Sequence, residues 1–599
     1  MKNIVKSAIL FFAAGSICAC SALDQRAKST FEDDIVFSNY ALARYAVNAI
    51  YESYITMATY RTDYFEYYGA NTDVEIRYSA EDAPQNNYCQ YKMTLNNIYF
   101  DKSGDDYPYA GNFKGIERAN LCIKGLKEYG NIDEDKQMGA LYGEALTVRA
   151  MLYTDLMNYY GEVPARFEPI NQETIYLPKA DKDVLYKHLL SDLETAAKYL
   201  DYNNQKLITV PGKACANGMY ARIALQAAGY SRRPDVGKVN TGDMGSVRKS
   251  YDPELQASVL YPKALAALKD VIDNAHLGLY ENYEDMWRFY CDMGAEYGTV
   301  NNPEIIFGLP FDDNRGQHLI RNCMPDDRNK TQSGYRITLN PALYFKFDKE
   351  DTRRDITCCF HKYDKDGKAD LSSASASNLY VGKYRQGWRS PGHEIPNKDS
   401  DDGCKFTYLR YADILLMAAE IANELGNLDE AKAYMRPVLV RAYKSEVLAD
   451  KYLDRLVDKD TFFNAIKDQR AFEFAGELLR RADLIRWGIL KESLDKAKSD
   501  MRLIQAHDGK YKSFLQTFYW RVKADGEPEI FGLNPGETGS PASDGNGTWK
   551  TKKFWSSMSN NRINNMYIGD PDIYMYRPIP PSILITNLGV LKNDYGYTY

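Results

Sequence analysis

The chain has 599 residues, of which 75 are basic and 82 acidic, and its formal net charge is −7. The two signs are mixed along the chain and no basic tract could follow the phosphates of a nucleic acid, so nucleic acid is not an expected partner. A chain of this length can bury a large core or carry two lobes.

The first 19 residues indicate an export signal. Lys2 and Lys6 form a positively charged N-terminal region, and residues 8–14 form an apolar core. Ile17-Cys18-Ala19 places small or apolar residues before Cys20. A helix needs about 20 apolar residues to cross a bilayer, so this shorter stretch is not a membrane span. We expect residues 1–19 to be removed as a signal peptide.

A cysteine at the first mature position indicates lipid attachment. The sequence Ile-Cys-Ala-Cys resembles the lipobox of bacterial lipoproteins, and the alternative is an ordinary signal peptide followed by a chance cysteine. Each buried methylene contributes about 0.8 kcal/mol and one acyl chain anchors only marginally, so several chains on Cys20 would hold the protein at a membrane. No later segment reaches 18 consecutive apolar residues, so none is expected to span the membrane.

Three pairs of predicted helices share one pattern, a first helix rich in small residues and an amphipathic partner: residues 143–161 with 183–200, 212–230 with 261–275, and the two halves of 408–442. In the third pair, Gly426 stands where a helix takes a left-handed cap, and LG-N-LDEA resembles the turn of a tetratricopeptide repeat. One hairpin cannot bury its own apolar face, so three or more should stack into a right-handed solenoid. The alternative is an ordinary helical domain with chance periodicity.

Long stretches rich in Gly, Asp, Asn, Ser and Tyr separate these helices: residues 69–112, 281–335, 361–404 and 524–565. Loops of such length are either functional or disordered, and their aromatic content favours function. The chain has 49 Tyr against 23 Phe and 6 Trp. Rings with a polar edge suit surfaces that stack on a ligand and hydrogen-bond at its rim, so ligand binding is expected in these loops.

The cysteines and acidic loops give no strong metal signal. Eight cysteines remain once Cys18 leaves with the leader and Cys20 carries lipid, and they show no CxxC pair or His-flanked cluster, which disfavours zinc. Most are predicted to be small buried residues, with one or two disulfides as the alternative. Residues 364–370 and 397–403 superficially resemble calcium loops but lack required EF-hand residues, so we expect solvated turns and no cofactor, with a structural calcium as the alternative.

Signatures of catalysis are absent from the sequence. The six His residues stand apart without HExxH spacing, and there is no GxSxG elbow, no GxxxxGK[ST] phosphate loop and no GxGxxG after a strand. Two facing carboxylates could hydrolyse a glycoside, but with 82 acids such pairs carry no specificity. We therefore expect that this protein is not an enzyme. The alternatives are a surface glycan-degrading enzyme and a structural protein that assembles partners.

Taken together and in order, several segments resemble the SusD-like (RagB/SusD) outer-membrane nutrient-uptake lipoproteins of Bacteroidetes-type bacteria. They are the lipobox with Leu23-Asp24, ALARYAVNAIYESY, NFKGIERANLCI, GEALTVRAMLYTDLMNYYGEVP, GMYARIALQAAGY, TYLRYADILLMAAEIANELGNLDEA, IKDQRAFEFAGELLRRADLIRWG, and YRPIPPSILITN with LKNDYGY. These segments span essentially the whole mature chain. The sequence departs from the commoner family form at Gln469, where Glu is usual, and at residues 590–592, where a Gln-Asn run is common.

Two of these segments also have a physical interpretation. Residues 466–488 carry charges at helical spacing, which predicts intrahelical ion pairs that hold a helix against the scaffold: Arg470, Glu473, Glu477, Arg480, Arg481 and Asp483. Pro578, Pro580 and Pro581 predict an extended tail that packs on the body.

The resemblance implies a mainly α fold: a superhelix of tetratricopeptide-like hairpins with long irregular loops and minor β-structure. It implies that residues 20–235 and 236–599 pack as one globular unit. It further implies a non-catalytic lipoprotein, anchored through Cys20 in the outer membrane and facing outward, that captures an oligosaccharide for a TonB-dependent SusC-like transporter. The hairpins would face the transporter and the loops would form the ligand site. Some members of the family capture a peptide instead, which would favour apolar pockets and backbone hydrogen bonds.

Aromatic residues beside polar partners mark the predicted ligand site. A pyranose presents C–H faces that stack on Trp or Tyr, and its hydroxyls need amide, carboxylate or Arg partners. The predicted ligand-binding residues are Tyr64, Tyr68, Asn71, Tyr91, Trp287, Tyr290, Arg385 and Trp388. The alternative for each ring is packing in the core, because no family motif fixes ligand residues in loops that vary with substrate.

Overall fold

The structure, a computed structural model, describes residues 32–597 except 56, 62, 80, 98, 102–103, 105–106, 203–206, 293–302, 312–318, 329–335, 394 and 396–400. The predicted leader and Cys20 lie outside the described residues. None of the described helices has the length and apolar character needed to cross a bilayer.

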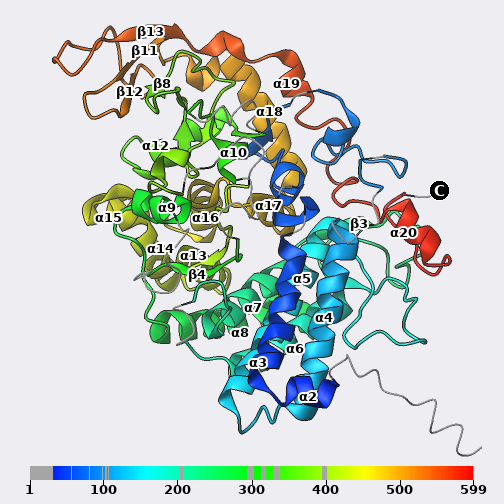
Figure 1. Ribbon diagram of the computed structural model, residues 1–599. Helices are drawn as coiled ribbons and strands as arrows, with labels where there is room; N and C mark the ends of the chain where they lie inside the picture. Colours follow the sequence, from blue (N-terminus) through cyan, green and yellow to red (C-terminus); the bar gives the residue numbers. More distant parts are fainter. Residues whose placement is uncertain are drawn as a thin grey trace, which may run out of the picture.

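The N-terminal part of the chain is helical (Figure 1). Its short helices are α2 (Asp33–Phe37), α3 (Tyr40–Asn48), η1 (Ala49–Tyr54), η2 (Met57–Arg61), η3 (Tyr64–Tyr68), η4 (Pro84–Asn86) and η6 (Pro253–Leu255). Its long helices are α4 (Pro108–Tyr129), α5 (Lys136–Tyr160), α6 (Lys182–Tyr199), α7 (Lys213–Ala228) and α8 (Ala257–Asn274).

The C-terminal part mixes short and long helices. Before the third hairpin come α9 (Tyr283–Cys291), α10 (Leu319–Cys323), α11 (Pro341–Tyr344), α12 (Arg353–Thr357) and η7 (Gln386–Trp388). The hairpin and the helices after it are α13 (Tyr411–Glu424), α14 (Leu428–Tyr443), α15 (Glu446–Asp454), α16 (Lys459–Phe474), α17 (Arg480–Arg486) and α18 (Leu490–Ala506). The last elements are η8 (Gly509–Tyr511), η9 (Trp555–Ser557), α19 (Asn560–Asn564) and α20 (Pro581–Thr586).

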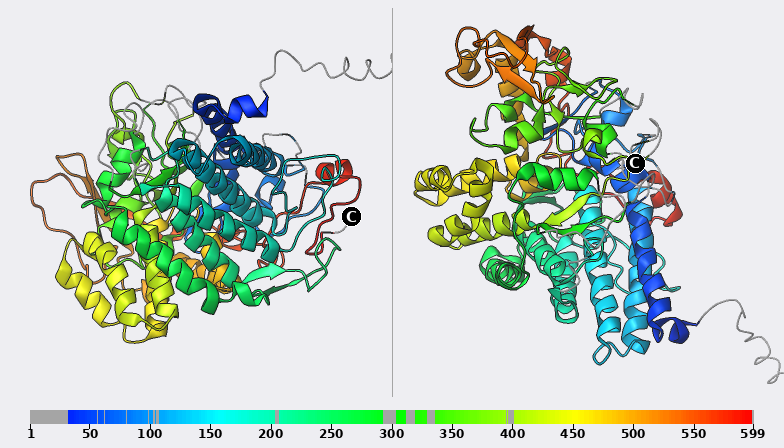
Figure 2. Two further views of the ribbon diagram at one scale, coloured as in Figure 1. Left: turned by 90° about the horizontal axis from the view of Figure 1, so that it is seen from below. Right: turned by 60° about the vertical axis from the view of Figure 1, so that its left-hand side comes forward.

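The predicted hairpins are confirmed and stack side by side (Figure 2). Each long helix packs on the next, in the order α4, α5, α6, α7, α8, α13 and α14. Gly426 has φ +86°, the left-handed cap predicted between α13 and α14. The predicted boundary at residue 235 falls between α7 and α8, which pack against each other, so the helix stack continues across it.

The helix α5 forms the centre of the N-terminal half. Helices α3, α4, α6 and α7 and the short helix η1 all pack around it, and nearly all of its residues are buried. Its small residues allow this close approach: a side-chain carbon added at Gly143 would lie 2.8 Å from Leu200 of the segment after α6. A helix buried on all sides has no single apolar face, which explains its weak amphipathic pattern.

The β-structure is minor and antiparallel. The strands are β1 (Glu75–Arg77), β2 (Ser231–Arg233), β3 (Ser246–Arg248), β4 (Ile305–Gly308), β5 (Ile337–Leu339), β6 (Cys358–Cys359), β7 (Lys362–Tyr363), β8 (Ala369–Asp370), β9 (Tyr380–Val381), β10 (Thr407–Arg410), β11 (Thr517–Val522), β12 (Pro528–Phe531) and β13 (Lys550–Lys553). Their sheets have the orders β1-β5-β9-β6, β12-β11-β13, β10-β4, β2-β3 and β7-β8. The β12-β11-β13 sheet lies at the end of the molecule opposite α2 and α3 (Figure 1).

Residues 466–488 do not form the single helix predicted from their charges. Helix α16 ends at Phe474, Gly476 turns the chain with φ +83°, and α17 starts at Arg480. The charged side chains of this segment consequently reach other elements. Arg470 pairs with Asp413 of α13 at 2.7 Å, and Arg480 pairs with Asp73 at 2.7 Å. The predicted structural role of these charges is confirmed, but their predicted intrahelical pairing is wrong for most of them.

The centre of this arrangement is a buried ion network, which contains the acids Glu304, Asp351, Glu473 and Glu477 and the bases Arg353, Lys383, Arg410 and Arg441. Glu473 binds Arg410 at 2.6 Å, Arg353 at 2.9 Å, and Arg441. Burial opposes ionisation of Glu473, but these three guanidiniums hold its pKa well below the usual range. Four acids balance four bases, so the network joins α12, β10, α14 and α16 without a buried net charge.

The C-terminal tail packs on the body as predicted, but it is not extended throughout. The Arg577 amide donates to the Tyr159 carbonyl at 2.8 Å, and Lys179 pairs with Asp594 at 2.5 Å. Pro581 begins α20, because a proline at the first helical position loses no hydrogen bond there.

The network predicts the effect of removing one charge. Glu473→Gln should destabilise the protein by about 3 to 5 kcal/mol, because three buried guanidiniums lose their shared acid. The matched change Glu430→Gln breaks an exposed pair with Lys269 and should cost less than about 1 kcal/mol. Chemical denaturation of both variants measures the difference, and equal losses would contradict a structural role for the network.

Candidate functional site

The first group of predicted ligand residues lies inside the protein. Tyr64, Tyr68, Asn71 and Tyr91 are each 4% exposed or less. The Tyr64 ring contacts the Tyr159 ring edge-on, and the Tyr68 ring stacks on Tyr159 with centroids 5.5 Å apart. The Asn71 amide donates to the Met566 carbonyl at 2.7 Å. All four side chains are therefore packed in the interior, and Asn71 also links the two halves of the chain.

The second group is also buried. Trp287, Tyr290 and Arg385 have exposed fractions of 0%, 0% and 4%. The Lys383 ammonium lies 4.6 Å from the Trp287 ring centre, and burial lowers the pKa of Lys383 to about 8. The Arg385 Nε donates to the Gly382 carbonyl at 2.7 Å. These residues therefore form core contacts, which corrects their expected place on an open platform.

A local signal in the sequence accounts for part of this burial. Tyr283, Met286, Trp287 and Tyr290 fall at i, i+3, i+4 and i+7 of α9, which is the pattern of one buried helical face. Arg288 falls between them on the exposed face. The periodicity alone favours the core alternative for Trp287 and Tyr290.

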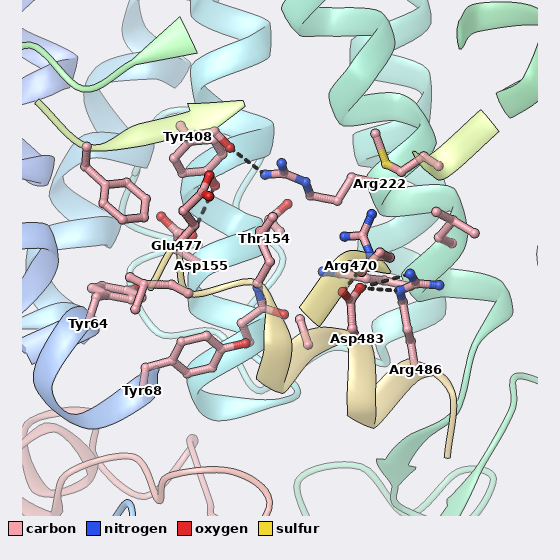
Figure 3. A pocket seen from close by; sticks show the side chains of 18 of the residues that line it. Tyr64, Tyr68, Thr154, Asp155, Arg222, Tyr408, Arg470, Glu477, Asp483 and Arg486 are labelled. Atoms are coloured by element: carbon pink, nitrogen blue, oxygen red, sulfur yellow. Dashed lines mark hydrogen bonds and ion pairs between the residues drawn. The ribbon is translucent and has the colours of Figure 1, made fainter. Parts of the chain in front are cut away.

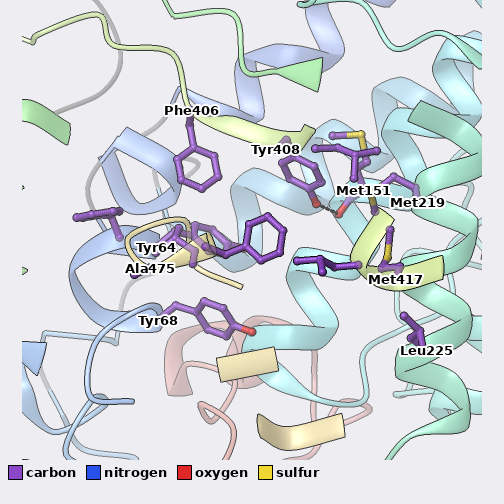
Figure 4. Close-up of a cluster of buried hydrophobic side chains, with 14 of the residues drawn as sticks. Tyr64, Tyr68, Met151, Met219, Leu225, Phe406, Tyr408, Met417 and Ala475 are labelled. Atoms are coloured by element: carbon purple, nitrogen blue, oxygen red, sulfur yellow. Dashed lines mark hydrogen bonds between the residues drawn. The ribbon is translucent and has the colours of Figure 1, made fainter. Parts of the chain in front are cut away.

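A small cavity lies among the buried tyrosines, between the N-terminal helices and α17 (Figure 3). Its volume is about 50 Å³, and its lining includes Tyr64, Tyr68, Asp155, Arg222 and Asp483. Ligand pockets for small molecules usually measure about 300 to 1,000 Å³, so this cavity does not fit a sugar ring. Apolar side chains surround it, among them Met151, Met219, Met417 and Phe406 (Figure 4).

Asp155 is the acid of this cavity. The hydroxyls of Tyr60 and Tyr408 donate to its Oδ1 at 2.9 and 3.1 Å, and its Oδ2 is buried without a hydrogen-bond partner. Burial raises the pKa of Asp155 to about 7, and the two tyrosine hydroxyls only partly offset this effect. Asp155 therefore joins η2, α5 and β10 through a carboxyl group that is partly protonated near neutral pH.

Trp388 is the exception among the predicted residues, because it is only half-buried. The guanidiniums of Arg288 and Arg385 lie 5.0 and 4.3 Å from its ring centre. Gly387 beside it is exposed, and a carbon added there would lie 3.0 Å from Nη2 of Arg328. Arg328 in turn lies 5.4 Å from the ring centre of Tyr363. We name Arg288, Arg328, Tyr363 and Trp388 the Trp388 surface.

The Trp388 surface combines aromatic rings with guanidinium groups, which is a chemistry suited to a polyhydroxylated ligand. The residues that the sequence-based prediction missed are Arg288, Arg328 and Tyr363. Glu284 pairs with Arg288 at 2.5 Å one helical turn away, which marks the exposed face of α9. Arg328 and Tyr363 have no local signal, because a β-bridge between Asp326 and Tyr363 brings their segments together.

Three larger grooves open elsewhere on the described surface. The first, of about 940 Å³, lies among α3, the start of α5 and the end of α6, and its rim includes Tyr40, Lys136 and Tyr199. The second, of about 440 Å³, lies between α4, α5 and α6, and its lining includes Arg149 and His188. The third, of about 430 Å³, is mainly apolar and lies beside α20, with Leu584 and Leu591 in its lining. None of the three contains a residue predicted to bind ligand.

The described residues contain no cluster of His, Cys, Asp and Glu that could hold a metal ion. In residues 364–370, the Asp364 carboxylate accepts from the amides of Asp366 and Lys368, both at 2.9 Å, so its own turn uses it. Residues 397–403 lie partly outside the described residues. All eight described cysteines are buried free thiols.

The fold defines an α-helical repeat scaffold with long irregular segments between its helices. Comparison with known proteins gives the family. The SusD family model matches residues 303–597, and a model described as "Starch-binding associating with outer membrane" matches residues 23–225. The chain belongs to the SusD-like family.

Individual relatives agree with this assignment. SusD-like protein P25 of Formosa agariphila is 24% identical over 526 residues, covering 82% of this chain and 90% of its own length. A SusD homolog of Bacteroides thetaiotaomicron has a similar structure, with a TM-score of 0.70, 17% identity, and coverage of 94% of this chain and 98% of its own. The surface glycan-binding protein A of the same organism, in complex with laminarihexaose, gives a TM-score of 0.59 at 16% identity, covering 92% and 99% of the two chains.

The raised pKa of Asp155 predicts that the stability of the protein depends on pH. Its carboxyl loses its proton near pH 4 in the unfolded chain and near pH 7 in the folded one, so folding binds a proton between these values. The free energy of unfolding should therefore fall as pH rises from 5 to 8, and Asp155→Asn should remove about 2 to 3 kcal/mol of that fall. Thermal unfolding of the wild type and of Asp155→Asn at pH 5 and pH 8 measures this change in stability. Equal slopes in the two proteins would contradict the shifted pKa.

Proposed function

We propose that this protein is a non-catalytic, lipid-anchored member of the SusD-like family that captures an oligosaccharide at the outer surface of the outer membrane. The family membership carries the proposal, since both family models describe SusD-like proteins and together match both halves of the chain. A structural relative named as a surface glycan-binding protein, in complex with laminarihexaose, shares the fold over 92% of this chain. The lipobox at Cys20 supplies the anchor.

The Trp388 surface is the proposed place of ligand contact. Its half-buried ring can stack on the C–H face of a sugar, while Arg288 and Arg328 offer donors to hydroxyl groups. Glycan capture is favoured over peptide capture because this surface is aromatic and polar, whereas a peptide site would use apolar pockets and an open strand edge.

The two carboxyl groups whose pKa is raised to about 7 are buried, which favours binding over catalysis. Asp155 and Glu75 both have a pKa raised by burial to about 7, the range of a general acid. However, Glu75 is buried and accepts hydrogen bonds from Thr72 and from the Gly476 amide, and Asp155 faces a cavity of about 50 Å³. Neither lies where a polysaccharide chain could reach it, so we assign these acids to the scaffold.

The proposed next step is delivery to a TonB-dependent SusC-like transporter. The helical hairpins that the family resemblance assigns to the transporter side lie beside the first described helices, because α2 packs on α4 and α3 packs on α4 and α5 (Figure 1). The anchor at Cys20 precedes Glu32 by only 12 residues, a reach of at most about 40 Å. The lipid would therefore keep the α2–α3 end of the molecule close to the membrane that holds the transporter.

A binding measurement tests the site. Trp388→Ala should weaken the affinity for a bound oligosaccharide at least about tenfold, because the stacking ring is lost. The matched variant Trp549→Ala changes a half-buried Trp of the loop before β13 and should bind like wild type. Calorimetry with laminarihexaose and maltoheptaose, extended to plant, host and microbial oligosaccharides and to mixed peptides, gives the affinities. Binding of peptides alone, or an equal loss in both variants, would overturn the proposed site.

A second prediction tests anchor and partner. Native protein extracted from outer membranes in mild detergent should copurify with a TonB-dependent transporter, which mass spectrometry identifies. Cys20→Ser should lose its lipid, leave the membrane fraction and lose most of the copurified transporter, because the membrane no longer concentrates the two proteins together. Purification of the wild-type lipoprotein with no transporter would count against delivery.

A further inference from the structure

Two buried cysteines from distant parts of the sequence lie together beside the Trp388 surface. Cys291 is the last residue of α9, and Cys404 comes shortly before β10. Both thiols are buried, with exposed fractions of 0% and 1%. They bracket a segment of more than 100 residues that includes Trp388.

Three contacts place the two cysteines side by side. The Cys404 Sγ lies 3.7 Å from the carbonyl oxygen of Tyr290, which belongs to the peptide unit that carries the Cys291 amide. Interaction with the Cys291 thiol also raises the pKa of Cys404 well above its usual value. Finally, Nη1 of Arg389 donates to the carbonyl of Cys291 at 3.1 Å and to that of Asp402 at 2.7 Å, so one guanidinium bridges the backbones of both segments.

We propose that Cys291 and Cys404 form a disulfide bond in the exported protein. The inference rests on the proposed location outside the cytoplasm, where thiols are oxidised. The two S–H bonds break and one S–S bond forms. The two electrons and two protons pass to a disulfide oxidant, such as a dithiol oxidoreductase in its oxidised form, which is reduced to two thiols. Because both thiols are buried in the folded chain, the bond forms during folding, before the thiols are covered.

The bond would add a covalent link to a junction already held by hydrogen bonds. It joins the end of α9, which carries Arg288, to the segment before β10, and the Arg389 guanidinium sits next to it. The Ser390 amide and hydroxyl donate to the carboxylate of Asp292, the residue after Cys291. A disulfide here fixes the base from which the Trp388 surface projects, and preorganisation of that kind lowers the entropy lost when a ligand binds.

Peptide mapping tests the pairing. The lipoprotein is extracted from membranes, denatured without reductant, alkylated with iodoacetamide and digested. We expect a Cys291–Cys404 cross-linked peptide that disappears on reduction, with the other six cysteines alkylated. Cys404→Ser should leave Cys291 alkylated, and the matched control Cys215→Ser should keep the cross-link. Eight alkylated cysteines, or a link from Cys291 to the nearby Cys323, would overturn the proposal.

Two further measurements test the Cys291–Cys404 pairing independently of the proposed location outside the cytoplasm. Refolding of the purified chain with glutathione disulfide should form the same cross-link. If the cross-link forms on refolding but is absent from the protein extracted from membranes, the proposed location outside the cytoplasm is contradicted, whereas the Cys291–Cys404 pairing is supported. Reduction should lower the melting temperature of wild type by about 3 °C, because it opens a loop of about 100 residues, and should leave Cys404→Ser unchanged. An equal shift in both proteins would contradict a stabilising bond.

Discussion

The fold depends on the buried acid Glu473 and the three guanidiniums around it. Arg353, Arg410 and Arg441 come from α12, β10 and α14, and each reaches Glu473 at the end of α16. Removing one member leaves an uncompensated charge in the core, which costs about 3 to 5 kcal/mol, so folding is favoured only when all of these elements meet. The network therefore fixes where the irregular segments join the helical stack. Gln469 takes part as well, since it accepts from Arg353 at 2.7 Å.

A second junction, built from tyrosines, connects the two halves of the chain. Tyr60 from η2 and Tyr408 from β10 share the carboxyl group of Asp155 in α5, more than 250 residues from Tyr408. The rings of Tyr60 and Tyr64 stack with centroids 4.8 Å apart, and buried aromatic pairs of this kind add to the energy of apolar burial. Many of the tyrosines therefore hold the core together and are not exposed to a ligand.

The core also sets the position of the proposed ligand surface. Trp388 lies next to a segment held by Arg389 and by the buried side chain of Arg385, so the position of its ring depends on the core beneath it. A site preorganised in this way loses little conformational entropy on binding. The same scaffold can carry different loops, which is how one fold serves many ligands.

The sequence by itself determined the helical hairpins, the cap at Gly426 and the family, because these depend on periodicity, on local backbone preference and on the order of motifs along the chain. It did not determine which aromatic residues of the loops are exposed, nor the partners of Glu473, Glu477 and Arg480. Burial and ion pairing there depend on segments hundreds of residues away, as when Arg480 meets Asp73. Only the tertiary structure decided that Tyr64 and Arg385 belong to the core while Trp388 reaches the surface, and that Cys291 meets Cys404, because no local pattern encodes a contact made across the fold.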